Sequence, residues 1–176
     1  MLVKLQSERL TVRDWRADEV EGRYRIFGNP EVRRFLSFGS DSMKDTAREL
    51  DSVVKSQSIA HPRPSYFLAV ELISSGQTIG NVGFEYRRSS TGDDPDVAEI
   101  GYFFEPSSWG HGYASEASLL VIQYAFRLGA ERVIAECDEK NSASENVMKR
   151  CGMTPLDSIN PRRLLYGIDY NSMECQ

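Results

Sequence analysis

Two glycines, Gly110 and Gly112, stand in the stretch SSWGHGYASEA at residues 107–117, between an apolar run and a segment with helical spacing of apolar residues. A glycine-rich turn into a helix leaves the first helical amides unpaired. These amides and the positive end of the helix dipole attract a phosphate or pyrophosphate. A plain strand-to-helix turn uses glycine for the same conformational reason, so the spacing alone leaves both interpretations open.

Known phosphate-binding motifs fit this stretch poorly. A P-loop has Lys and then Ser or Thr after its last glycine, whereas Tyr113 and Ala114 follow here. The dinucleotide fingerprint needs a third glycine, which is absent from the stretch. An enzyme of nucleotide phosphates would also need an acidic metal-binding cluster and a phosphate-neutralising lysine near the loop. The sequence therefore gives little support to that class of function.

The composition is that of a soluble globular protein. The chain has 176 residues, 40% of them hydrophobic and 27% charged, which is enough to bury a core. A formal net charge of -5 argues against broad binding to nucleic acid or to an anionic membrane. Three cysteines and two histidines without ligand spacing fit neither a disulfide framework nor a zinc site. With no apolar run of the ~20 residues that span a bilayer, we expect a cytoplasmic protein with reduced thiols.

Alternation and helical spacing predict the elements that hold the glycines in place. We expect strands at residues 9–15, 66–73, 77–86, 97–105, 131–138 and 162–173, helices at 17–28, 29–36, 42–56, 113–130 and 141–153, and a mobile loop at 87–96. The two strands at 66–86 have a hairpin pattern, whereas the helix after the glycines must return the chain to a parallel strand. Ser142 and Glu145 are spaced as a capping box. The pattern predicts one α/β domain over residues 1–176, with helices covering a mixed sheet.

Three segments in the right order carry a resemblance to a known family. GHGYASEA follows AEIGYFFEPSSW, and NSASENVMKRCGM comes about 30 residues later. Together they resemble the GNAT acyltransferase superfamily, and most of all its RimJ/RimL-like branch of ribosomal-protein-alanine N-acetyltransferases. The opening at residues 7–36 is also similar to that branch, so the resemblance covers nearly the whole chain. It implies a single-domain GNAT fold, with a mixed, mostly antiparallel sheet whose central strands splay apart, flanked by helices.

The resemblance also implies a reaction and a co-substrate. The family moves an acetyl group from acetyl-coenzyme A to a primary amine, either a protein or peptide N-terminus or a small amine, and needs no metal. Its signature of Gln or Arg, two residues, Gly, any residue, then Gly or Ala falls on Ser107, Gly110 and Gly112. Ser107 departs from the pattern, but a loop that binds through backbone amides does not depend on that side chain.

Several positions match the family's coenzyme-binding residues. The pyrophosphate would bind the loop formed by Trp109, Gly110, His111, Gly112, Tyr113 and Ala114. Phe103, Phe104 and Glu105 end the preceding strand, whose backbone would pair with the pantetheine arm. Asn141 and Ser144 would lie beside the pantetheine and the thiol. Core packing also explains the two aromatic rings, and ordinary helix capping also explains Asn141 and Ser144.

The catalytic groups are less complete than the coenzyme loop. Glu99 matches a carboxylate that acts in relatives as a general base through water, although a strand-borne Glu is commonly solvated or paired. Alternation places Glu99 and Phe103 on one face of the strand and Tyr102 on the other. Many relatives have a tyrosine acid where this chain has Met148, which cannot donate a proton. Ser144 is the nearest replacement, or else water protonates the thiolate.

The acceptor is the least specified part of the reaction. The family's acceptor groove corresponds here to Arg33, Phe35, Phe38, Tyr86 and Tyr166, all of which can instead be packing residues. The resemblance leaves the acyl length, the amine and a homodimer open. It also leaves an alternative function from another class, a catalytically degenerate acyl-coenzyme A-binding sensor or interaction module. Met148 and Ser107 are the residues that favour this alternative.

Overall fold

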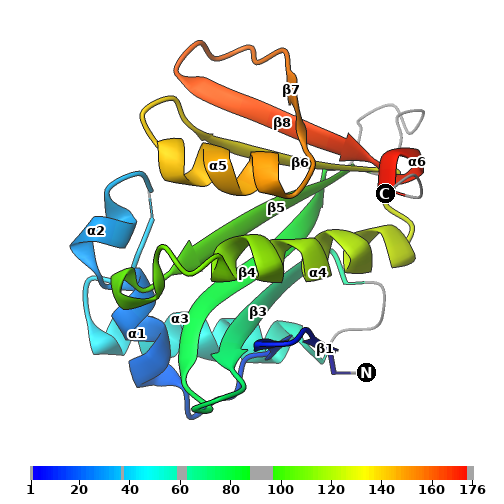
Figure 1. The fold of residues 1–176 in the computed structure, drawn as a ribbon. Coiled ribbons are helices and arrows are strands. Elements are labelled where there is room, and N and C mark those ends of the chain that lie inside the picture. Colours follow the sequence, from blue (N-terminus) through cyan, green and yellow to red (C-terminus); the bar gives the residue numbers. More distant parts are fainter. Residues whose placement is uncertain (1, 37, 59–62, 88–96, 174–176) are drawn as a thin grey trace.

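A computed structural model describes residues 2–36, 38–58, 63–87 and 97–173. One eight-stranded sheet runs in the order β1-β2-β3-β4-β5-β6-β8-β7, with helices on both faces (Figure 1). The strands are β1 (Lys4–Gln6), β2 (Leu10–Asp14), β3 (Ser65–Leu72), β4 (Thr78–Arg87), β5 (Val97–Phe104), β6 (Arg132–Asp138), β7 (Thr154–Leu156) and β8 (Arg163–Asp169). The helices are α1 (Val20–Phe27), α2 (Pro30–Arg33), α3 (Met43–Ser56), α4 (Tyr113–Arg127), α5 (Ser142–Arg150) and α6 (Tyr170–Met173), and a 3-10 turn covers Pro106–Ser108.

The arrangement confirms the expected fold class. Strands β1 to β5 are antiparallel neighbours, β5 and β6 are parallel, and β8 pairs antiparallel with both β6 and β7. The mixed, mostly antiparallel sheet follows from the hairpin at residues 65–87 and from α4, which carries the chain back to start a parallel strand. No helix in the described residues is long and apolar enough to cross a membrane.

Three local predictions differ from the structure, and a fourth cannot be compared with it. Strands β1 and β7 were not expected, because three residues are too few to give a visible alternation. The last strand ends at Asp169 rather than 173, since its partner β6 begins at Arg132, the residue opposite Asp169. Asn141, not Ser142, caps α5, because its side chain accepts the Ser144 amide at 3.1 Å. The loop predicted at 87–96 lies, apart from Arg87, outside the described residues.

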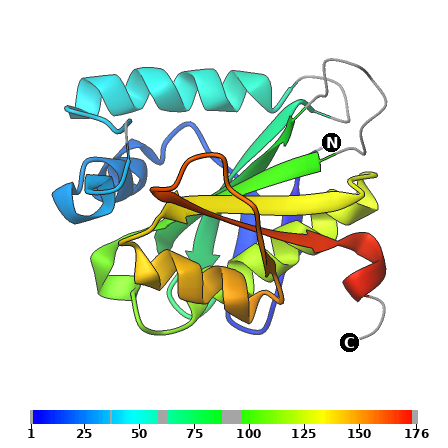
Figure 2. The ribbon, with the colours of Figure 1, turned by 90° about the horizontal axis from the view of Figure 1, so that it is seen from above.

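The sheet carries a separate hydrophobic core on each face. Figure 2 shows α3 on one side of the sheet and α5 on the other. The larger core packs Val121 of α4 and Met148 of α5 against strand residues such as Val82 and Ile100, whereas the smaller one joins α1 and α3 around Trp15 and Phe27. Alternation along β5 sends Ala98 and Ile100 into the larger core and Phe103 toward the smaller one, as the sequence predicts.

The centre of the sheet opens into a fork. Parallel pairing of β5 and β6 covers only three residue pairs, Val97 with Arg132, Ala98 with Val133, and Glu99 with Ile134. Beyond them β5 continues to Phe104 and β6 to Asp138 without pairing to each other, and Figure 1 shows the two strands diverging. The carboxyl ends of both strands lie at the open end of the fork, and each leads to the N-terminus of a helix.

A buried ion pair fixes the start of the chain to the first long hairpin. The Arg63 guanidinium donates to both Asp14 oxygens, at 2.6 and 3.0 Å, and the Val3 amide donates to the same carboxylate at 2.8 Å. The Arg63 and Asp14 side chains are only 2% and 5% exposed. The hydrogen bonds that Arg63 donates to Asp14 raise the pKa of Arg63. Neither charge could stay buried without the other.

We therefore expect Asp14→Asn to lower the free energy of unfolding by about 3–5 kcal/mol, because it leaves Arg63 buried without its counter-ion. The matched control is Asp169→Asn, which removes the carboxylate from an exposed pair with Arg132 and should cost less than about 1 kcal/mol. Urea unfolding of both variants measures the difference. Equal losses would show that burial does not set the strength of the Asp14–Arg63 pair.

Candidate functional site

The turn between β5 and α4 has the backbone of an anion-binding loop. Gly110 and Gly112 adopt left-handed conformations, with φ of +79° and +80°, which a residue with a Cβ atom would adopt only with strain. Gly112 is the N-cap of α4, so the first amides of the helix have no partners within it. Trp109 closes the turn, since its indole nitrogen donates to the Phe104 carbonyl at 2.8 Å. The geometry can hold a phosphate group as well as turn the chain.

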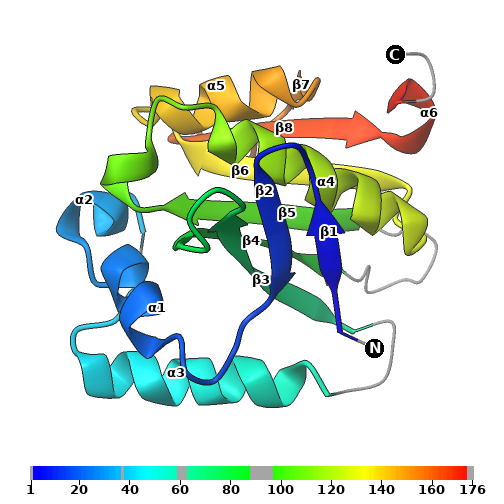
Figure 3. The same cartoon turned by 60° about the horizontal axis from the view of Figure 1, so that its bottom comes forward.

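Arg9 ties this loop to the turn between β1 and β2, which lies beside α4 in Figure 3. Its Nε donates to Glu116 at 2.8 Å and its Nη1 to the His111 carbonyl at 3.1 Å, while its guanidinium lies 4.8 Å from the centre of the Tyr113 ring. The Ser7 hydroxyl also donates to Glu116, at 2.7 Å. The Arg9 guanidinium therefore contacts the glycine turn from the neighbouring turn between β1 and β2.

The same contacts keep the Glu116 carboxyl, at the start of α4, ionised. Burial would raise the pKa of Glu116, but hydrogen bonds from Ser7 and Arg9 hold it below its ordinary value. An ionised Glu116 near the helix N-terminus would repel a bound anion, and the Arg9 guanidinium offsets that charge. No local pattern predicts this role, since Arg9 and Glu116 are 107 positions apart in the chain. The exposed His111 ring stacks on Tyr113 with ring centres 5.4 Å apart.

The end of β5 uses its side chains for packing and its backbone to line the fork. The Phe104 ring is buried against Gly80, and the Phe103 ring packs on Phe27 at 5.4 Å between ring centres. Buried Glu105 accepts from Gln77 at 2.9 Å and from Arg25 at 3.3 Å, which anchors α1 to the strand. Residues 100–104 pair with β4 on one side only. Their other edge faces the fork, where β6 does not pair with it and the Phe104 carbonyl accepts from the Trp109 indole.

A polar cluster lies at the fork, where β5, β6 and α5 meet. The Tyr102 hydroxyl, from β5, lies 2.8 Å from the Ser144 hydroxyl and 2.9 Å from the Ser144 carbonyl. Ser144 is in the first turn of α5, and its amide is fixed by Asn141. Burial raises the pKa of the Cys137 thiol, from β6, and a hydrogen bond from Ser144 offsets part of that rise. Sequence reasoning singled out Asn141 and Ser144 but not Tyr102.

The two remaining catalytic candidates have different surroundings. Met148 is completely buried in the larger core, so the residue at the tyrosine position of the relatives is a packing residue here. Glu99 lies at the last paired position of β5, on the face opposite Tyr102, where it forms an ion pair with Arg87 of β4. The hydrogen bond that Arg87 donates to Glu99 raises the pKa of Arg87. Glu99 is thus a half-buried carboxylate with a counter-ion at the branch point of the fork.

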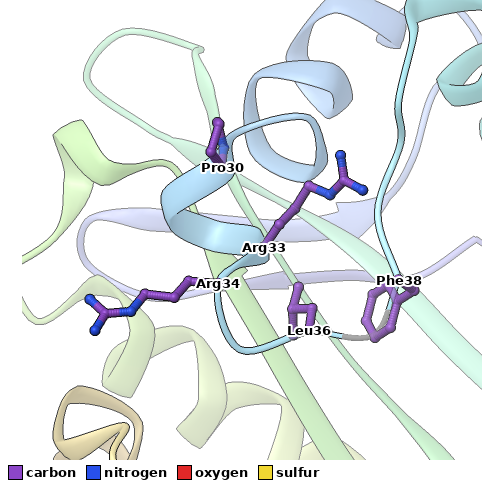
Figure 4. Close-up of a pocket in the computed structure, with 5 residues that line it drawn as sticks. All are labelled: Pro30, Arg33, Arg34, Leu36 and Phe38. Atoms are coloured by element: carbon purple, nitrogen blue, oxygen red, sulfur yellow. The ribbon is translucent and has the colours of Figure 1, made fainter.

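The structure brings only some of the acceptor candidates together. Arg33 and Phe38 line a pocket of about 340 Å³ with Pro30, Arg34 and Leu36, and Figure 4 shows Arg33 and Arg34 extending in opposite directions from α2. Phe38 is 54% exposed and its ring lies 5.6 Å from that of Phe103, which comes from β5.

The other three candidates lie elsewhere or beside the pocket. The Phe35 ring packs under the Arg34 guanidinium, 5.2 Å away. The Tyr86 hydroxyl donates to the Leu128 carbonyl at the closed end of the fork, opposite Ala98. The Tyr166 hydroxyl donates to Glu145 on α5 at 2.7 Å. Among the described residues, no group of three or more His, Cys, Asp or Glu side chains could hold a metal ion.

The charge balance at the loop yields a test with pyrophosphate itself. We expect Arg9→Gln to weaken pyrophosphate binding about two- to fivefold at low salt, because the Glu116 carboxylate is then unbalanced beside the helix N-terminus. Glu116→Gln in the same chain should restore the affinity. Thermal shift against pyrophosphate measures this, with Arg16→Gln, an exposed arginine paired to Glu71, as the control. Wild-type affinity in Arg9→Gln would remove Arg9 from the loop's charge balance.

Comparison with known proteins agrees with this geometry. The family model for the acetyltransferase (GNAT) domain matches residues 9–154. The uncharacterized N-acetyltransferase YoaA of Bacillus subtilis is 27% identical over 154 residues, covering 84% of this chain and 81% of the relative.

Solved structures match the fold over nearly the whole chain. A GNAT-family acetyltransferase from Bacillus anthracis aligns with a TM-score of 0.75 at 22% identity, covering 95% of this chain and 98% of that one. The ribosomal-protein-S5-alanine acetyltransferase of Vibrio fischeri aligns with a TM-score of 0.75 at 15% identity, covering 95% and 96%. The chain belongs to the GNAT family and is an acetyltransferase.

Proposed function

We propose that this acetyltransferase moves an acetyl group from acetyl-coenzyme A to a primary amine, either a peptide N-terminus or a small amine. GNAT domains use acetyl-coenzyme A as co-substrate. The fork between β5 and β6 carries the proposal, because its open end gathers the glycine turn, the free edge of β5 and the start of α5. Ligands bind where strands part at their carboxyl ends and helix N-termini face the opening.

Different segments of the chain bind different parts of acetyl-coenzyme A. The amides of residues 110–114 hold the pyrophosphate, with Arg9 balancing the charge of Glu116. The free backbone edge of Phe103 and its neighbours pairs with the pantetheine amides, as an added strand would. Asn141 and Ser144 then lie beside the thioester, because they stand at the carboxyl end of the second diverging strand.

The chemistry requires a base for the amine and help for the departing sulfur. The amine nitrogen attacks the thioester carbonyl, and its proton passes through water to Glu99 at the branch of the fork. The carbon–sulfur bond then breaks and its electron pair stays on sulfur, which gains a proton to become a thiol. Ser144 is the hydroxyl group on α5 nearest to this event, since Met148 is buried and has no proton to give.

The acceptor enters from the side of α2. The pocket of Arg33 and Phe38 joins the fork through the Phe103 ring, which gives the amine a route to the thioester. The relative named as a ribosomal-protein-S5-alanine acetyltransferase acts on a protein alanine, and this supports peptide N-termini as acceptors here. Met148 favours the alternative function, an acyl-coenzyme A sensor that binds without turnover, because no acid stands at the usual position on α5.

A turnover screen separates the enzyme from the sensor. Acetyl-coenzyme A is offered with small amines and with peptides beginning with Ala, Ser or Met, and thiol release is measured. We expect steady release with at least one amine. Coenzyme A binding without release across the whole panel would favour the sensor.

The binding site itself is tested with two glycine variants of matched conformation. Gly110 and Gly76 both have left-handed backbones, with φ of +79° and +70°, and an added Cβ would meet nothing within 4 Å at either. Each Ala variant should therefore lose about 1–2 kcal/mol of stability. Only Gly110→Ala should also weaken coenzyme A binding, by about tenfold, as measured by titration calorimetry. Equal coenzyme affinities in the two variants would place the pyrophosphate elsewhere.

Glu99→Gln tests the general base. We expect kcat to fall by about 100-fold while the coenzyme A affinity stays unchanged, because the amide cannot accept the proton of the amine. Glu85→Gln is the matched control, since Glu85 stands directly opposite Glu99 on β4 and is exposed. Unchanged turnover of Glu99→Gln would leave Glu99 as a structural partner of Arg87.

A further inference from the structure

We propose that Tyr102 is a positioning residue that aims the Ser144 hydroxyl at the departing sulfur, and that this pair stabilises the thiolate by a hydrogen bond in place of the acid absent at position 148. The inference rests on the proposed function and adds a residue to it. Sequence reasoning had assigned no role to Tyr102, which stands in the β5 segment that has lost β6 as a partner.

The pair lies where the fork borders the larger core, against which the Tyr102 ring packs. Tyr102 comes from the diverging part of β5, Ser144 from the first turn of α5, and Cys137 from the diverging part of β6. Ser144 is half-buried, so a ligand in the fork can reach its hydroxyl. Met148, one helical turn further on, is completely buried in the larger core.

The hydrogen bonds around Ser144 allow two proton arrangements. The Tyr102 hydroxyl lies within reach of both the Ser144 hydroxyl, at 2.8 Å, and the Ser144 carbonyl, at 2.9 Å. If Tyr102 donates to the carbonyl, the serine proton is drawn to the tyrosine oxygen. If Tyr102 donates to the serine oxygen, the serine proton is free to donate to sulfur, and the chain of two hydroxyls strengthens that donation. Negative charge on sulfur favours the second arrangement.

Tyr102 is suited to hold its proton rather than to give it away. Burial raises the pKa of Tyr102 well above its ordinary value, more than the hydrogen bond to Ser144 lowers it. The tyrosine therefore stays a neutral donor throughout the reaction. The carbon–sulfur bond breaks with its electron pair on sulfur, Ser144 stabilises the thiolate by a hydrogen bond, and solvent supplies the proton that completes the thiol. A thiolate is only modestly basic, so this sequence needs no stronger acid.

The pair also has a structural reading, because the bond to the Ser144 carbonyl helps to hold α5. Two readouts separate the roles. A double-mutant cycle asks whether Tyr102 acts through the Ser144 hydroxyl, since residues that work as a unit give non-additive losses. A change of leaving group asks whether the loss is tied to charge on sulfur.

The experiment uses the full chain with the best amine from the turnover screen. We expect Tyr102→Phe to lower kcat about tenfold with an unchanged KM for acetyl-coenzyme A, and Ser144→Ala to lower it at least as much. The double variant should be no slower than Ser144→Ala alone. Ser144→Thr, which keeps a hydroxyl, should retain most of the activity only while Tyr102 is present. Tyr124→Phe, another tyrosine against the same core, is the matched control and should match the wild type.

The leaving-group arm uses the acetyl thioester of p-nitrothiophenol, whose thiolate is far less basic than that of coenzyme A. We expect Tyr102→Phe to match the wild type in kcat/KM with this donor. Equal losses with both donors, or losses that multiply in the double variant, would overturn the proposal and leave Tyr102 a structural residue. A wild-type protein that releases no thiol with any amine would instead contradict the proposed function itself.

Discussion

The site depends on one constraint, that β5 and β6 pair over only three residues before they part. Backbone donors and acceptors along a diverging strand edge must find partners in water or in a ligand. In this protein β5 stays paired with β4 along its other edge, from Val97 to Phe104, while β6 diverges. The smaller core holds it there through Phe103, which packs on Phe27 and Phe38. An extended amide-bearing molecule can therefore bind without the strand having to reorganise.

Charge is arranged around this fork by arginines that come from distant parts of the chain. The protein is acidic, with a formal net charge of -5, and a polyanionic co-substrate would be repelled by unpaired carboxylates near the opening. Glu116 is balanced by Arg9, Glu105 by Arg25, and Glu99 by Arg87. Each pair also ties two elements together, so the contacts that neutralise the site are the ones that fix the glycine turn, α1 and β4 around it.

The sequence was informative where a local pattern determines the structure. Alternation along β5 correctly separated Phe103 from Ile100, and the glycine pair marked the left-handed turn before α4. The pairs Arg9–Glu116 and Tyr102–Ser144 join residues 107 and 42 positions apart, and no periodicity reports such contacts. Tyr86 is a residue whose type suggested a role that its position in the sheet does not support. Its type suited an acceptor groove, but the register of β4 places it at the closed end of the fork, opposite Ala98.

Met148 changes how a proton donor would have to be supplied. A residue four positions after Ser144 lies on the same side of α5, and in this chain that position completes the larger core. A tyrosine there would have to displace core packing or turn toward the fork. Tyr102 instead reaches the fork from the sheet, where strand geometry fixes its ring and burial keeps its hydroxyl protonated. Under the proposed mechanism, an aromatic hydroxyl on the strand leaves Met148 of α5 to pack in the larger core while Ser144 of the same helix contacts Tyr102. Core packing and the contact with the fork then fall on different turns of α5, at Met148 and at Ser144.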